Sequence, residues 1–477
     1  MIQRRHQQRN LLDTVIGSVE ELIEGLIEAR LKRLDEILAD EALLDAVMQE
    51  LAQRRPHSRS RGRPGTPGEV ALRMLVLKRI KGWSFEQTEY EVRQSLVYRH
   101  LARVYFERVP DAKTLIRLSA AIGTDGIEAI HCRLVEMACA QGLIKGQRAR
   151  VDTTVVETNI RYPTDSRLLQ DGVRVLTRAF KRIEQGTGVV GGKLRDPMRA
   201  TTHRVLEIAR AARSRAGQGR ERLEQGYRRL LAIMRSTVRD AQRVSSELAS
   251  GARVALSQSV VRAVTNSQAE LEHFVPLVRR VMAQTQARIF KNDTHYSDKV
   301  FSLFEPHSEA IRKGKAAKPT EFGKLLRVQE AEHQIVVDYE VYEQRPEDQS
   351  LVIPTIEAHL RVFGRAPQLL AADRGFWSAA NRRAAQERGV KQVCIPALGK
   401  LTAEQAAEQR QRWFRRGQRW RVGCEGRISI LKRRDGLERC RYHGMAGMRR
   451  WVGWGVVSNN LWVLMKSTRP VRGHDTG

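Results

Sequence analysis

The stretch Arg150-Val-Asp-Thr-Thr-Val-Val-Glu157 carries an acidic residue, Asp152, within a run of β-branched residues that is typical of a strand. A second apolar run, Pro367-Gln-Leu-Leu-Ala-Ala-Asp373, ends in an acidic residue and is followed by Arg-Gly-Phe. We expect both runs to be strands of one sheet. If the strands are adjacent, their ends bring the carboxylates of Asp152 and Asp373 together.

A third acidic residue, Glu425, lies in Arg421-Val-Gly-Cys-Glu425-Gly-Arg-Ile-Ser-Ile-Leu-Lys432. At about 100° per residue, Arg421 and Lys432 fall within about 40° of Glu425 around a helix. The spacing therefore predicts a metal-binding carboxylate flanked by two phosphate-directed cations. A solvated, salt-bridged helix surface explains the same triplet. Gly423 and Gly426 weaken a helix here, although they would let a DNA backbone approach closely.

Asp152, Asp373 and Glu425 together are candidate ligands for two divalent cations. Carboxylate oxygens with open water positions suit Mg²⁺, and Mn²⁺ could substitute. Such a pair activates a water or a 3′-hydroxyl and stabilises the leaving oxygen of a phosphodiester. Glu157 lies five residues beyond Asp152, so a regular strand sends its side chain to the opposite face and excludes it as a direct ligand.

The charge of the chain points to a polyanionic partner. It contains 84 Lys and Arg against 54 Asp and Glu, a net charge of +30, while 41% hydrophobic residues support folded cores. No apolar run approaches the roughly 18 residues of a membrane span. The five cysteines form no C-x-x-C pair, which favours reduced thiols in a cytosol, and Cys424 is interpreted as a small filler. We expect a cytoplasmic, nucleoid-associated, prokaryotic protein.

The chain carries, in this order, Asp-x-Thr, a strand ending in Asp-Arg-Gly-Phe, and Arg-x3-Glu-x6-Lys. This arrangement resembles the DDE transposases of bacterial insertion sequences. The similarity is to an ISNCY-like group that carries Glu-x-Asn-Ile-x-Tyr-Pro-Thr-Asp-Ser, here Glu157-Thr-Asn-Ile-Arg-Tyr-Pro-Thr-Asp165-Ser166, and it extends over residues 65–465. It implies a ribonuclease H-like core. In related transposases a Tyr often stands three residues before the Arg, and here Gln418 takes that position. Trp420 and Tyr442 are candidates to replace that Tyr.

Four regions are expected along the chain. Residues 1–64 hold N-terminal helices and a basic linker, in which Arg61-Gly-Arg63-Pro resembles an AT-hook core, although a plain solvated linker also fits. Residues 65–145 form a helical domain whose helices begin at a Thr66/Glu69 capping box, a Ser84/Gln87 capping box and an Asp111 cap. Arg93 and Arg99 would contact DNA there, unless the module serves only dimerisation.

The catalytic core is expected at 146–170 and 289–470, where strands and helices alternate to give a mixed α+β fold. Between its two parts, residues 171–288 have a helical texture with 23 Lys and Arg against 10 Asp and Glu, a surplus of +13. A compact sheet does not need so long a connection, so we interpret this segment as an inserted helical domain. DNA-end binding and dimer clamping are both open for it.

The sequence therefore predicts a transposase that cuts DNA at the ends of an insertion sequence and joins them to target DNA. Asp152, Asp373 and Glu425 would hold the two metal ions, and Arg421 and Lys432 the phosphates. Its partners would be the terminal inverted repeats, the target duplex and further copies of the chain, as a homodimer or larger assembly. A metal-dependent nuclease of the same fold and a non-catalytic DNA-binding protein are the alternatives.

Overall fold

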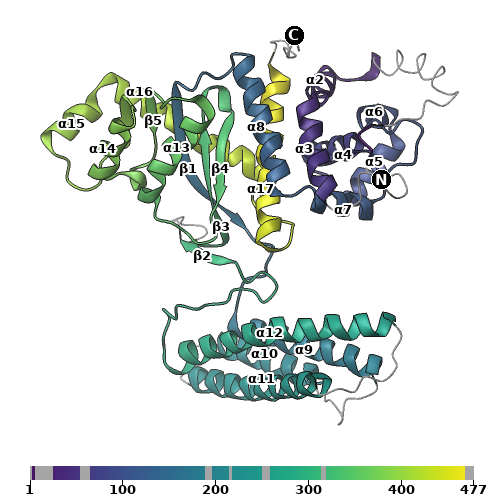
Figure 1. Cartoon of the computed structure of the whole chain (residues 1–477). Coiled ribbons are helices and arrows are strands. Elements are labelled where there is room, and N and C mark those ends of the chain that lie inside the picture. The colour runs from purple at the N-terminus through teal and green to yellow at the C-terminus, as the bar shows by residue number, and fades with distance from the viewer. Residues whose placement is uncertain are drawn as a thin grey trace. The chain divides into compact units, whose positions relative to one another are not determined.

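A computed structural model of the chain describes residues 3–5, 25–53, 65–187, 196–213, 218–249, 258–312 and 319–467 (Figure 1). The chain divides into two compact units. The first unit comprises Met1–Thr158 and Gly323–Gly477, and the second comprises Asn159–Phe322. The predicted mixed α+β class is confirmed, and among the described residues no helix is long and apolar enough to cross a membrane.

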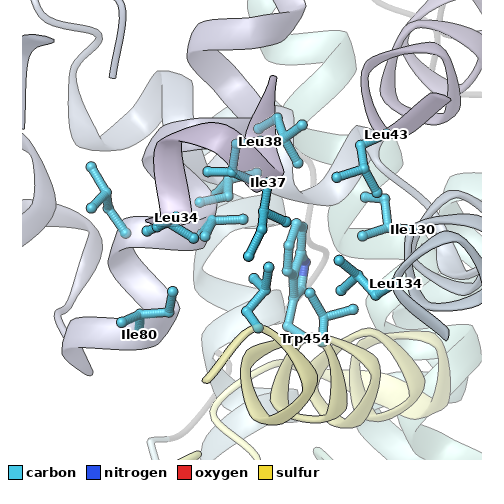
Figure 2. Close-up of a cluster of buried hydrophobic side chains, with 14 of the residues drawn as sticks. Leu34, Ile37, Leu38, Leu43, Ile80, Ile130, Leu134 and Trp454 are labelled. Carbon is cyan, nitrogen blue, oxygen red and sulfur yellow. The ribbon is translucent and has the colours of Figure 1, made fainter. Parts of the chain in front are cut away.

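The N-terminal part of the first unit is helical. Its described helices are α2 (Ala29–Leu38), α3 (Glu41–Gln53), α4 (Gly68–Lys81), α5 (Phe85–Gln94), α6 (Leu96–Leu101), α7 (Ala112–Ala121) and α8 (Thr124–Ala140). Their apolar faces form one core with Trp454, which comes from the C-terminal helix α17 (Gly444–Lys466) (Figure 2). Trp451 and Trp454 of this last helix are both buried.

Two of the three predicted helix caps are confirmed. Ser84 and Gln87 form a reciprocal capping box at α5, and Asp111 accepts a hydrogen bond from the amide of Thr114 at α7. The Thr66/Glu69 capping box is wrong, because α4 begins only at Gly68 and has no side-chain cap.

Other partners replace that cap. The amide of Gly68 donates to the carbonyl of Gln3 over 2.8 Å, so backbone satisfies a free N–H of the first turn. The carboxylate of Glu69 binds Arg73 Nε at 3.0 Å, which keeps it from reaching back to the cap position.

The sheet of the first unit has five strands, namely β1 (Arg148–Glu157), β3 (Thr320–Glu330), β4 (Val336–Val341), β5 (Leu369–Ala371) and β6 (Gln392–Cys394). β3 lies antiparallel between β1 and β4, whereas β5 is parallel to β1 and β6 is parallel to β5. With the short strand β2 (Glu309–Arg312) the sheet has six strands in the order β2-β3-β1-β5-β6, and β4 also pairs with β3. β1 spans the predicted residues 148–157.

Helices cover both faces of this sheet. On one face, α13 (Val352–Phe363) and α14 (Ala379–Glu387) pack on Ala149 and Val151 of β1. On the other face lie α16 (Arg412–Arg433) and α17, which bury Val156 and Leu369. Shorter elements complete the unit: α15 (Ala403–Arg410) and the 3₁₀ turns η1 (Glu332–Gln334), η2 (Asp348–Leu351) and η3 (Arg374–Phe376).

The second unit is mainly helical. Its described elements are α9 (Asp165–Thr187), α10 (Met198–Ala211), α11 (Gly219–Ala249), α12 (Gln258–Phe290) and the short strand β2 (Glu309–Arg312). The helices share their own hydrophobic core, in which Leu169, Leu230 and Val281 are fully buried. In the chain, this unit stands between β1 and β3 and contains the whole predicted insertion 171–288.

Candidate active site and nucleic-acid interface

Asp152 lies on β1, and Asp373 follows the end of the adjacent parallel strand β5 as the cap residue of η3. The last register pair of β1 and β5 is Arg150 with Ala371, and each aspartate follows its member of that pair by two residues. Because side chains alternate along a strand, the side chain of Asp152 leaves the sheet on the same face as that of Arg150. Ala371 packs in the cluster with Phe414 of α16, so this is the face that α16 covers. Parallel strands lie about 4.8 Å apart, so the backbone segments that carry the two aspartates are adjacent.

A buried ion pair fixes α16 on this face. The guanidinium of Arg150 on β1 donates to the carbonyl of Trp420 at 2.5 Å and to Glu330 Oε2 at 2.7 Å. A Cβ at Gly423 would lie 2.3 Å from Arg150 Nη1. The helix continues without a break through both glycines, and Gly423 serves close packing on Arg150.

Glu425 lies on the exposed side of this helix. Its side chain is 60% exposed and its Oε1 accepts a hydrogen bond from Arg421 Nη2 at 3.0 Å. The two residues therefore share one helical face, as the spacing predicts, and they form the ion pair of the alternative interpretation. The preceding residue, Cys424, is buried. Burial raises its thiol pKa well above the ordinary value, and the charges of Glu330 and Asp152 raise it further, so Cys424 packs near Asp152 and is no nucleophile.

The three carboxylates are only partly assembled. Within the described part of the chain, no three His, Cys, Asp or Glu side chains are close enough together to hold a metal ion. Each carboxylate makes a local contact, since Asp152 accepts from the amide of Thr153 and Asp373 from that of Arg374, while Glu425 pairs with Arg421. The three carboxylates supply oxygen donors, which are the ligands that hard divalent cations prefer.

Two other acids of the quoted motifs have structural partners. Glu157 is buried and its Oε2 lies 3.3 Å from Arg439 Nη2. Asp165 is buried in the second unit and accepts hydrogen bonds from Gln284 and Arg288, both at 3.1 Å. Asp165 thus ties the start of α9 to α12.

The position that related transposases give to Tyr has a packing role here. Gln418 Nε2 donates to the carbonyl of Cys394 on β6 at 2.8 Å, which directs this side chain at the sheet. Trp420 stacks on the guanidinium of Arg150, 5.0 Å from the ring centroid, and is half-buried. Tyr442 lies on a different wall, where its ring stacks on that of Phe85.

The remaining predicted DNA contacts vary in accessibility. Arg93 is exposed and pairs with Glu89 one turn earlier. Arg99 is half-buried and donates to the carbonyls of Tyr105 at 2.6 Å and Glu107 at 2.7 Å, so its guanidinium holds a turn. Arg61 and Arg63 lie outside the described residues.

A basic cavity in the first unit has no counterpart in the sequence interpretation. It has a volume of about 880 Å³ and is lined by the end of α4, the start of α5, the segment after α16 and the start of α17. Lys432 lines it, together with Lys78 and Arg441. No linear spacing connects Lys78 with Arg441, so only the basic composition of each segment could have signalled the cavity.

Residues 20–120 match the family model of a transposase domain, DUF772. The matched stretch includes α2 to α6 and most of α7. The match supports a transposase role. Transposases in general are enzymes that process DNA, so DNA is the implied partner. The prediction is confirmed at this general level. No curated protein and no solved structure gives a match.

Proposed function

We propose that the chain is a DDE transposase of the insertion-sequence type, which cuts DNA at the ends of its element and joins them to a target. One observation carries this proposal: Asp152 and Asp373 each follow a member of one register pair of adjacent parallel strands by two residues, in the sheet on which the helix of Glu425 packs. The net charge of +30 supports DNA as the partner. The match to a transposase domain supports the class.

The strand arrangement supports a ribonuclease H-like core. Three antiparallel strands, β4, β3 and β1, continue into β5 and β6, which run parallel to β1. The resemblance to DDE transposases implies this order of strands, with the acidic residues on β1, after β5 and on a later helix.

In this proposal Asp152, Asp373 and Glu425 would hold two Mg²⁺ or Mn²⁺ ions. Such ions supply an activated water or 3′-hydroxyl and stabilise the leaving oxygen of the phosphodiester. Arg421 holds the exposed carboxylate of Glu425 on its face of α16 and presents a guanidinium suited to bidentate contact with phosphate. The Arg150 guanidinium keeps α16 on the sheet and so positions Glu425.

The test uses the full chain and DNA that carries the inverted repeats flanking its reading frame. Asp152→Asn, Asp373→Asn and Glu425→Gln should each abolish Mg²⁺-dependent nicking and joining, and each should retain DNA binding, because binding depends on cations elsewhere. Glu157→Gln is the matched control, since Glu157 pairs with Arg439 away from the carboxylates. Calorimetric titration with Mn²⁺ gives an independent readout, and the affinity for Mn²⁺ should be lower in each of the three variants.

The outcomes separate the candidates. Nicking without joined products would favour the nuclease of the same fold. Unchanged nicking in one carboxylate variant would remove that residue from the metal site. DNA binding without metal-dependent cleavage would favour a non-catalytic DNA-binding protein.

A further inference from the structure

The basic cavity of the first unit contains an excess of unneutralised positive charge. Eight Lys and Arg line it against three Asp and Glu. The charges of Arg434 and Asp435 neutralise each other in an ion pair of 2.9 Å, and Asp435 also accepts a hydrogen bond from Ser458. The side chains of Lys78 and Arg441 form no ion pair and no hydrogen bond with any residue that the structure describes.

Lys78 is held in an unfavourable position for a cation. Its side chain is 8% exposed, and its ammonium lies 4.4 Å from the ring centroid of Phe85. Its pKa is lowered to about 8, chiefly by burial and also by the charges of Arg79 and Arg441, while Glu86 acts in the opposite direction. The ring and the C-terminal end of α4 offset part of this cost. A bound anion would neutralise the two cations together.

We propose that this cavity holds a phosphate group of the DNA backbone, with Lys78 and Arg441 as its contact residues. A volume of about 880 Å³ exceeds what one phosphate needs and admits a short stretch of strand. The aromatic walls favour phosphate over a stacked base, because Lys78 covers Phe85 and Arg79 lies 4.0 Å from the ring centroid of Trp451. The choice of DNA as the source of phosphate rests on the proposed function.

The cavity also has a defined position relative to Glu425. Lys432 lines the cavity and stands seven residues after Glu425 on the same helix. Seven residues of α-helix span about 10 Å, which equals roughly three nucleotides at about 3.4 Å per step of one strand. If the strand follows the helix from Glu425 to the cavity, we expect the bound phosphate on the order of three nucleotides from the bond that is cut.

The test measures binding of a fluorescein-labelled DNA duplex to the full chain at several salt concentrations. Lys78→Met and Arg441→Gln should each weaken binding about three- to tenfold and reduce the slope of log K against log salt by about 1. Arg361→Gln is the matched control. Arg361 is an exposed cation of α13, and this substitution removes one positive charge from the same unit. An unchanged slope in both cavity variants overturns the proposal.

Neutral methylphosphonate linkages locate the contact. Replacing single phosphates near the cut should weaken binding to the wild-type chain at one position about three nucleotides away. The same replacement should cause no further loss in Lys78→Met. An equal further loss would place that phosphate elsewhere on the protein.

A second anion distinguishes DNA from an acidic protein. Labelled polyglutamate should bind the wild type and both variants alike; selective loss of polyglutamate binding with intact DNA binding would assign the cavity to an acidic protein and overturn the proposal. Circular dichroism checks that each variant is folded. Should the chain fail to cleave DNA while both variants still lose DNA binding, the cavity assignment stands and the enzymatic proposal falls.

Discussion

Arg150 fills the space that Gly423 leaves open on the facing side of α16. A Cβ at residue 423 would lie 2.3 Å from Nη1 of this guanidinium, which also donates to Glu330 and to the carbonyl of Trp420. The glycine therefore allows the helix that carries Glu425 to approach the strand that carries Asp152. Removal of either partner should change the position of α16.

Substitution of the two glycines of α16 should have opposite effects. Gly423→Ala should lower the free energy of unfolding by about 1–3 kcal/mol, because the new methyl group overpacks against Arg150. Gly426→Ala should raise it by about 0.5–1 kcal/mol, since no atom lies within 4 Å of its Cβ position and alanine favours the helix. Urea unfolding followed by circular dichroism measures both. Equal effects of the two variants would contradict the packing role of Gly423.

Lys78 should destabilise the folded protein at neutral pH. Its pKa is lowered from 10.5 to about 8 by burial, with Arg79 and Arg441 adding to the shift and Glu86 opposing it. Below pH 8 the ammonium is charged in both states, so the folded state bears the full cost. Between pH 8 and 10.5 only the unfolded state keeps the proton, and the free energy of unfolding rises with pH.

Lys78→Met should therefore stabilise the protein at neutral pH by about 1–3 kcal/mol, and this gain should vanish as the pH approaches 10.5. Thermal unfolding of wild type and variant across this range gives the difference. Weaker DNA binding by a more stable variant would distinguish a binding residue from a structural one. Loss of stability at neutral pH would show that the ammonium is well solvated or paired.

The Arg421 and Lys432 face can be tested by its salt dependence. If both residues meet phosphates, Arg421→Gln and Lys432→Gln should each reduce the salt slope of DNA binding by up to about 1, with little dependence on DNA sequence. Arg421 also pairs with Glu425, so its variant should in addition strengthen Mn²⁺ binding, because the carboxylate loses a competing cation. An unchanged slope in both variants would leave the face a solvated ion pair.

The second unit should be removable without loss of the sheet. Glu157 and Gly323 are register partners of β1 and β3, so a turn of two to five residues can join Thr158 to Gly323 as a hairpin. A variant that lacks residues 159–322 should unfold cooperatively, yet pair DNA ends poorly, because the +13 surplus is lost. Thermal unfolding and gel shifts measure the two properties. Global unfolding of the variant would make the unit integral to the core.

Local signals account for much of the fold. The β-branched run at 148–157, the Ser84 capping box and the Asp111 cap act within a few residues, and each appears where it is predicted. The Thr66/Glu69 box fails because the carbonyls of Gln3 and Arg4, which are distant in sequence, accept from the amides of Gly68 and Glu69. Arg73, one turn later on the same helix, binds the carboxylate of Glu69. Local propensity is overridden where tertiary partners compete for the same hydrogen bonds.

The sequence by itself determined the candidate residues, namely Asp152 within a strand, Asp373 after a strand, the Arg421-Glu425 helical face and the excess of positive charge. Periodicity and spacing encode these features because strands and helices repeat over short distances. Only the tertiary structure decided which residues meet. The pairing of β1 with β5, the packing of Arg150 on Gly423 and the meeting of Lys78 with Arg441 all join distant segments, and their physical cause is burial of the shared core.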